Sequence, residues 1–176
     1  MNFRRIVCFD LEMCCWNDGR NPSTGEIIEI GVAEIDLVSK EIVKRSQYYV
    51  TPEKDEISQY CIDLTHITPS IIRKQGRPLK DVLESMKANY GNTNKIYGAW
   101  GRDDLVLFNE CKQKDIPLPF REYLNIATLY RIHHRDKNKR YGMRIAMEKA
   151  GLEFEGTQHS GYNDAYNLAR LALTFL

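Results

Sequence analysis

Residues 4–12 read RRIVCFDLE, an apolar run that is interrupted by two acids, Asp10 and Glu12. A short apolar run of this kind predicts a buried strand. Because successive side chains of a strand alternate between its faces, Asp10 and Glu12 leave the same face, close enough to share one or two divalent cations. The alternative is that the two acids simply end the strand at solvent, and the pair alone does not decide between these interpretations.

The bulk composition limits the protein class without identifying a partner. A chain of 176 residues with 43% hydrophobic content is enough for one substantial core, so we expect a single domain over residues 1–176. The 25 basic residues nearly balance the 24 acidic ones, so net charge neither indicates nor excludes a nucleic-acid partner. Five scattered cysteines without CxxC spacing disfavour a disulfide framework and a structural zinc site, and fit reduced thiols.

The apolar run at residues 6–11 is too short and too charged to be a signal peptide or a membrane span. We therefore expect a soluble cytoplasmic protein with no membrane association.

The remaining sequence predicts an α/β fold. Two further strands follow closely, at residues 27–35 and 41–50, and their short connections favour an antiparallel meander. After residue 65, helical periodicity alternates with short strand-like pieces. The expected later elements are helices at residues 78–90, 103–114, 141–149 and 162–176, and a strand at 95–100.

A third acid is expected at the start of the helix that begins near residue 103, where Asp103 and Asp104 are adjacent. Helical spacing places Leu107, Phe108 and Cys111 on one side, and Asp104 lies three, four and seven residues before them. We therefore favour Asp104 as the functional carboxylate. Asp103 would then project about one helical step away and complement the helix dipole.

A histidine and a fourth acid lie near the C-terminus, in the stretch HSGYND at residues 159–164. Asp164 is in the first turn of the expected last helix, and His159 is in the loop before it. Taken alone, the pair is better explained as a solvent histidine and an aspartate that complements the helix dipole.

The combination is more specific than its parts. An Asp-x-Glu on a first strand, an Asp on a middle helix and a His-x-Gly-x-x-Asp that opens the last helix resemble the DEDDh 3′-5′ exonucleases, the DnaQ-like and RNase T-like family. Supporting stretches are IEIG at residues 28–31 and YCIDLTHIT at 60–68, and the resemblance covers residues 4–176. FDLEMC at residues 9–14 and WGRDD at 100–104 are most similar to the ERI-type branch.

Two departures from the family pattern stand out. Gly161 replaces the usual alanine of the His-x-Ala-x-x-Asp signature, and the RDD sequence leaves the choice between Asp103 and Asp104 open.

The resemblance implies a ribonuclease H-like fold: a five-stranded mixed sheet with its first three strands antiparallel and helices on both faces. It also implies two divalent cations, Mg²⁺ or Mn²⁺, bound by Asp10, Glu12, Asp104 and Asp164, with Asp10 bridging ions about 4 Å apart. One ion would activate water and the other would stabilise the leaving 3′ oxygen. His159 is the implied general base.

The implied reaction is hydrolysis of single-stranded RNA or DNA from the 3′ end to nucleoside 5′-monophosphates, with RNA favoured by similarity to the ERI-type branch. The candidate contacts to the terminal nucleotide are side chains that flank the acids and could stack on bases, although each could equally belong to the core: Met13, Leu64, His66 and Trp100. The basic segment at residues 131–140 could grip phosphates or be a solvated loop.

Two other functions fit the same pattern. One is a nucleic-acid-binding or regulatory protein that kept the fold and lost catalysis. The other is an endonuclease or transferase on the same scaffold, which would not need the spacing of His159 and Asp164.

Overall fold

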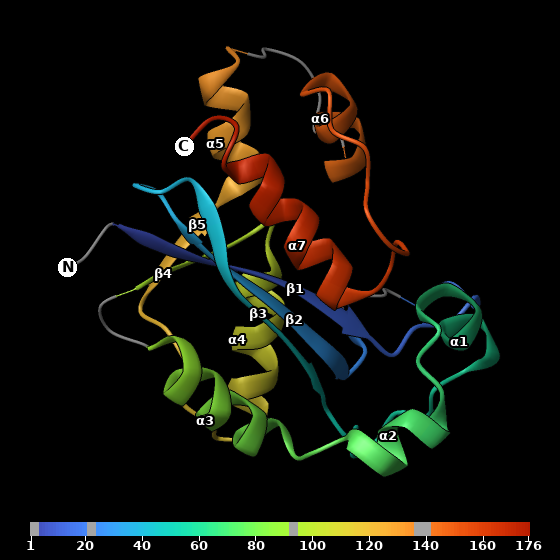
Figure 1. Ribbon diagram of the computed structural model, residues 1–176. Coiled ribbons are helices and arrows are strands. Elements are labelled where there is room, and N and C mark those ends of the chain that lie inside the picture. The colour runs from blue at the N-terminus through green and yellow to red at the C-terminus, as the bar shows by residue number, and fades with distance from the viewer. Residues whose placement is uncertain (1–3, 21–23, 92–94, 136–141) are drawn as a thin grey trace.

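The computed structural model describes residues 4–20, 24–91, 95–135 and 142–176, and a five-stranded mixed sheet forms its centre (Figure 1). The strand order is β3-β2-β1-β4-β5. The first three strands pair antiparallel, as expected. β4 is parallel to β1, and β5 is parallel to β4. The strands are β1 (Arg5–Met13), β2 (Ile27–Asp36), β3 (Glu41–Tyr49), β4 (Ile96–Ala99) and β5 (Glu122–Asn125).

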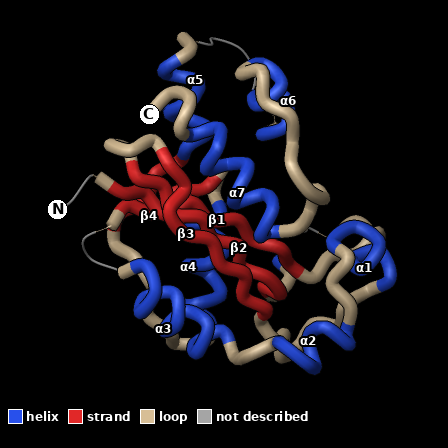
Figure 2. Tube along the Cα trace, viewed as in Figure 1, coloured by secondary structure: helices blue, strands red, loops and turns tan. Residues whose placement is uncertain are grey.

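Helices cover both faces of this sheet, which confirms the predicted α/β architecture (Figures 1 and 2). On one face lie α3 (Leu79–Tyr90) and α4 (Asp103–Gln113), and on the other lie α7 (Gly161–Ala172) and α5 (Ile126–His133). The short helix α6 (Met143–Lys149) packs beside α5 and α7. Two further short helices, α1 (Gln59–Thr65) and α2 (Pro69–Gln75), lie beyond the end of the sheet where β1 finishes.

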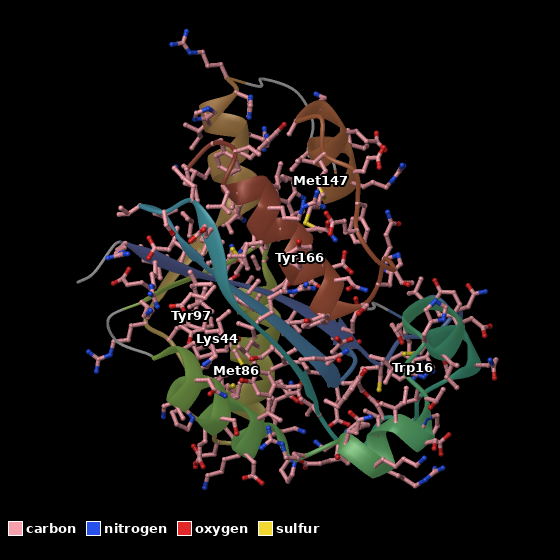
Figure 3. All side chains as sticks on the ribbon, in the orientation of Figure 1. Trp16, Lys44, Met86, Tyr97, Met147 and Tyr166 are labelled. Atoms are coloured by element: carbon pink, nitrogen blue, oxygen red, sulfur yellow. The ribbon has the colours of Figure 1, made fainter. Side chains whose placement is uncertain are left out.

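The alternation along β1 separates two hydrophobic cores. Val7, Phe9 and Leu11 face α3 and α4, where they pack with residues such as Tyr97 and Met86 (Figure 3). Ile6 and Cys8 face the opposite way and are buried beneath α7. The period of two in the sequence thus fixes which residues of β1 lie under α7.

Most of the expected elements are present within a few residues of their predicted bounds, but four were not predicted. These are α1, α2, β5 and α5, none of which is longer than eight residues. The last helix ends at Ala172, so the expected continuation to residue 176 was wrong. Half of the basic segment, residues 136–140 with Lys137, Lys139 and Arg140, and the predicted helix start at Tyr141 lie outside the described residues.

Among the helices of the described ranges, none has both the length and the apolar character that a bilayer crossing requires.

Candidate active site

The two acids of β1 lie on the same face of the strand as the apolar residues that α7 covers, near the point where α7 begins. Ile6 and Cys8 are covered by α7, and the next side chains on that face are Asp10 and Glu12. In the antiparallel register, Asp10 is opposite Gly31 and Glu12 is opposite Glu29. The sheet therefore presents three carboxylates on one face, beside the first turn of α7.

Asp164 of α7 completes a compact cluster with the two acids of β1. One carboxylate oxygen from each of Asp10, Glu12 and Asp164 lies within 4.8 Å of the other two. The backbone N–H groups of Ser160 and His159 donate to the Asp164 carboxylate, the former at 3.1 Å. These bonds fix Asp164 against the loop that precedes its own helix.

The middle acid is the point at which the structure corrects the sequence interpretation. The buried face of α4 is formed by Leu107, Glu110 and Cys111, whereas Phe108 is 45% exposed. Asp103 precedes these buried residues by four, seven and eight positions, so it shares their face. The expectation that Asp104 lies on the buried side of this helix was wrong, because it took Phe108 to be buried.

The contacts of the two adjacent aspartates agree with this correction. The Asp103 carboxylate accepts a hydrogen bond from the backbone N–H of Leu11 in β1. The neighbouring strand β4 ends at Ala99 and does not extend far enough to pair with Leu11. The Asp104 carboxylate instead pairs with the exposed guanidinium of Arg102, at 2.9 and 3.1 Å. Asp103, and not Asp104, is the acid of α4 that stands beside Asp10 and Glu12.

Burial and repulsion from neighbouring carboxylates raise the pKa values of all four acids. The pKa of Asp10 lies well above its usual range because of burial first, and then because of Asp103, Asp164 and Glu12. Burial, followed by Asp164 and Glu29, raises the pKa of Glu12 to about 8. Burial is also the main reason that the pKa values of Asp103 and Asp164 rise to about 7 and about 6.

This surplus of negative charge fits a divalent cation. The largest influences on Asp10 and Glu12 all raise their pKa values, and none of these comes from a lysine or arginine. Clustered carboxylate oxygens are the ligands that Mg²⁺ and Mn²⁺ prefer, and such sites commonly leave coordination positions for water and phosphate. These carboxylates are therefore chemically suited to bind metal ions whose remaining coordination positions are filled by a phosphorylated substrate.

His159 lies at the edge of this cluster. It is exposed, it has a left-handed backbone with φ of 58°, and it comes directly before the N-cap of α7. Its N–H donates to Asp164, so the acid and the histidine are connected through the backbone. An exposed imidazole in this position is accessible to a substrate or to water.

The four candidate substrate contacts lie in separate parts of the structure rather than in one pocket. Met13 follows Glu12 and packs partly against the core beneath α3 and α4, and Leu64 packs against the small core around α1 and α2. His66 is exposed and lines a pocket of about 180 Å³ with Glu29. Trp100 lines a different cavity of about 400 Å³. Its ring packs edge-on against that of Tyr130, with 5.7 Å between the ring centroids.

Glu29 is a residue of this site whose importance the sequence analysis did not recognise. Its side chain is buried, with 1% of the residue exposed, and its charge raises the pKa values of Asp10, Glu12 and Asp164. The available signal was an acid inside the apolar stretch IIEIGV at residues 27–32, on a strand expected to pair with β1. A carboxylate in such a strand requires hydrogen-bond partners.

Comparison with known proteins agrees with this geometry. Residues 7–172 match the RNase T family model, which describes an exonuclease. The human protein ERI1 exoribonuclease 2 is 28% identical over 97% of this chain, and rat 3′-5′ exoribonuclease 1 is 30% identical over 97%. The chain spans only 28% and 52% of the lengths of these two relatives.

The fold is shared with a solved structure that is described as the nuclease domain of 3′hExo, a DEDDh family member, bound to rAMP. The two are 29% identical, with a TM-score of 0.84 over 97% of this chain and 90% of that one. With a family model that matches nearly its whole length and a fold that matches a DEDDh nuclease domain, this chain belongs to the RNase T family of exonucleases.

Proposed function

We propose that this protein is a metal-dependent exonuclease that removes nucleotides one at a time from the 3′ end of single-stranded nucleic acid, with RNA preferred. The observation that carries the proposal is the convergence of Asp10, Glu12 and Asp164 within 4.8 Å, with Asp103 beside them and no side-chain cation among the main influences on Asp10 and Glu12. Membership of an exonuclease family supports the same reaction class.

Asp10, Glu12, Asp103 and Asp164 are the proposed ligands for two Mg²⁺ or Mn²⁺ ions. When bound, such ions would supply Lewis-acid activation of water and neutralise charge on the phosphate and the leaving oxygen. The chain's own residues contribute position and proton transfer. The Asp164 carboxylate is held by two backbone N–H groups, and we assign the exposed imidazole of His159 the role of general base that takes the proton from the attacking water.

The proposed substrate preference comes from the relatives. Both curated relatives are named exoribonucleases, and the solved nuclease domain of 3′hExo binds rAMP. We therefore propose RNA 3′ ends as substrate and nucleoside 5′-monophosphates as products. Met13, Leu64, His66 and Trp100 remain proposed contacts to the terminal nucleotides, where apolar and aromatic faces would stack on bases.

The test is cleavage of 5′-labelled single-stranded RNA and DNA of one sequence, in Mn²⁺, Mg²⁺ or EDTA, with products separated by length. We expect a ladder that shortens from the 3′ end, faster on RNA, and that disappears in EDTA and in Asp10→Ala. Intact substrate in both metals would contradict the proposal and favour a binding protein that lacks catalysis.

A circular RNA of the same sequence distinguishes exonuclease from endonuclease action. An exonuclease leaves the circle intact, because the circle has no free 3′ terminus. Cleavage of the circle at a rate similar to that of the linear RNA would instead indicate an endonuclease on the same fold.

A further inference from the structure

Glu29 is a buried carboxylate that the proposed reaction does not use. It lies on β2 directly opposite Glu12, with 1% of the residue exposed. It is not among the three acids whose carboxylate oxygens converge within 4.8 Å of one another. A buried carboxylate outside that cluster is stable only with hydrogen-bond partners of its own, so its presence needs a separate explanation.

Its hydrogen bonds supply that explanation. One Glu29 oxygen accepts the Tyr162 N–H at 2.9 Å and the Gln47 side-chain amide at 2.8 Å, and the other accepts the Gly161 N–H at 3.1 Å. Gly161 and Tyr162 are the first two residues of α7. The N–H groups of a first helical turn have no partner inside their own helix.

The usual local alternative is absent from α7. A serine at the N-cap commonly accepts a hydrogen bond from the first turn, but the Ser160 side chain makes no such bond. Glu29 takes this capping role from a strand that is 132 positions away from Gly161 in the sequence. The cap therefore also fastens the start of the helix to the sheet.

Close backbone packing makes the attachment precise. A Cβ atom built on Gly31 would lie 1.8 Å from the Gly161 carbonyl oxygen. The start of α7 therefore packs directly on the β2 backbone, at a position where only glycine fits. A Cβ on Gly161 would lie 3.1 Å from the Gly31 nitrogen and 3.3 Å from the Asp10 carbonyl oxygen. The glycine that departs from the family's alanine thus sits in a tight contact between α7 and the two central strands.

We propose that Glu29 is a positioning residue, which caps α7 from β2 and thereby sets the places of Asp164 and His159 relative to Asp10 and Glu12. Asp164 follows the capped Gly161 by three residues, in the same turn, and His159 precedes it by two. This inference rests on the proposed function for its catalytic consequence, whereas its effect on metal binding can be measured without catalysis.

The test compares Glu29→Gln with Glu34→Gln, a matched control on the same strand. Glu34 is also buried, but its carboxylate pairs with Lys95 and Arg5, on the far side of Gly31 from Glu29. A glutamine at position 29 keeps the size of the side chain but replaces one of the two acceptor oxygens with an NH₂ donor, so in the same position it leaves one of the two helix N–H groups facing a donor instead of an acceptor.

For Glu29→Gln we expect kcat on RNA to fall by about 10- to 100-fold with KM little changed, because a small displacement of catalytic groups is sufficient for such a loss. The Mn²⁺ concentration that gives half of the metal-induced rise in melting temperature should also increase, by about tenfold, as is typical when a group that orients metal ligands is lost. Glu34→Gln should change neither quantity. Wild-type kcat and wild-type Mn²⁺ titration in Glu29→Gln would overturn the proposal.

Two further variants keep the test decisive. Glu29→Asp retains the charge but shortens the side chain by one methylene, so it should fail like the glutamine. Full recovery of kcat and of the Mn²⁺ titration in Glu29→Asp would overturn the proposal, because it would show that the charge is sufficient without the cap. Should Glu29→Gln not fold, Gln47→Leu removes one hydrogen bond that holds the carboxylate, and we expect a smaller loss of the same kind. Unchanged kcat and Mn²⁺ titration in Gln47→Leu would also count against the proposal.

The Mn²⁺ titration separates the two levels of inference. A wild-type protein that cleaves no RNA would contradict the proposed function, yet the shift of the titration in Glu29→Gln would still report on positioning. A normal wild-type ladder with an unaltered variant would contradict the role of Glu29 alone.

Discussion

The single variants Asp103→Asn and Asp104→Asn are expected to differ in activity and stability, although the two residues are adjacent and of the same type. Asp103 is held against β1 by the Leu11 N–H, and its pKa is raised from 3.8 to about 7, mainly by burial. Asp104 is paired with Arg102 at the surface. The Asp103→Asn variant should therefore lose activity and gain stability without metal, whereas Asp104→Asn should do neither.

The size of the stability effect follows from the pKa. A shift of about three units corresponds to about 4 kcal/mol between the charged and neutral forms, at roughly 1.4 kcal/mol for each unit. Because the folded-state pKa is raised, the stability that this group contributes is complete below about pH 4 and is lost as the pH rises through about 7. At pH 8 without metal, the asparagine should raise the free energy of unfolding by about 2 to 4 kcal/mol.

The assay is thermal unfolding in EDTA at pH 8 and at pH 4, together with RNA cleavage in Mn²⁺. A gain of 2 to 4 kcal/mol corresponds to roughly 5 to 15 °C for a domain of this size, and it should vanish at pH 4. Asp104→Asn should change stability by less than about 1 kcal/mol, as expected for an exposed ion pair. If Asp104→Asn abolished cleavage while Asp103→Asn kept it, the assignment of the middle acid would be refuted.

Three other predictions concern the histidine, the metal and a remote ion cluster. His159→Ala should lower the cleavage rate by about 10²- to 10⁴-fold while it keeps the Mn²⁺-induced rise in melting temperature; near-normal turnover would make the histidine a spectator. Mg²⁺ or Mn²⁺ should raise the wild-type melting temperature more at pH 8 than at pH 5, because protonated carboxylates bind cations poorly, and equal shifts in a calorimetric scan would contradict this. The pKa of Glu26 is lowered to about 2 by the Lys114 ammonium and three backbone N–H groups, against the opposing effect of burial, so its contribution to stability is present above about pH 4.5 and is lost as the pH falls through about 2. At pH 7, the free energy of unfolding of Glu26→Gln, measured by urea denaturation, should therefore be about 2 to 3 kcal/mol lower than that of the wild type. Near pH 2 the two proteins should be equally stable, and an equal deficit at both pH values would refute this role of Glu26.

The sequence predicted the parts of the fold that have strong periodicity. The alternation along residues 5–13 decides which side chains face α7, and it placed Asp10 and Glu12 together correctly. The elements that were missed, such as α1 and β5, are only seven and four residues long, so local periodicity has little length in which to appear. They are stabilised by tertiary packing, for example of Cys61 in α1 against Cys14 and Ile28.

The site was predictable as far as its residue types, but not in its detail. Spacing along α4 identified the right pair of aspartates, yet it chose Asp104 because Phe108 was taken as buried. Sequence spacing does not show that β4 ends before it reaches the Leu11 N–H. This N–H group donates to the Asp103 carboxylate instead. The role of Glu29 likewise depends on a contact between residues 132 positions apart, which only the folded chain brings together.

The most direct test of the metal site is the anomalous diffraction of Mn²⁺ in crystals of this protein that contain a nucleoside 5′-monophosphate. The account predicts Mn²⁺ peaks among the carboxylates of Asp10, Glu12, Asp103 and Asp164, with Asp104 still paired to Arg102. Well-ordered crystals in which these four carboxylates carry no Mn²⁺, or in which Asp104 binds the metal in place of Asp103, would contradict it.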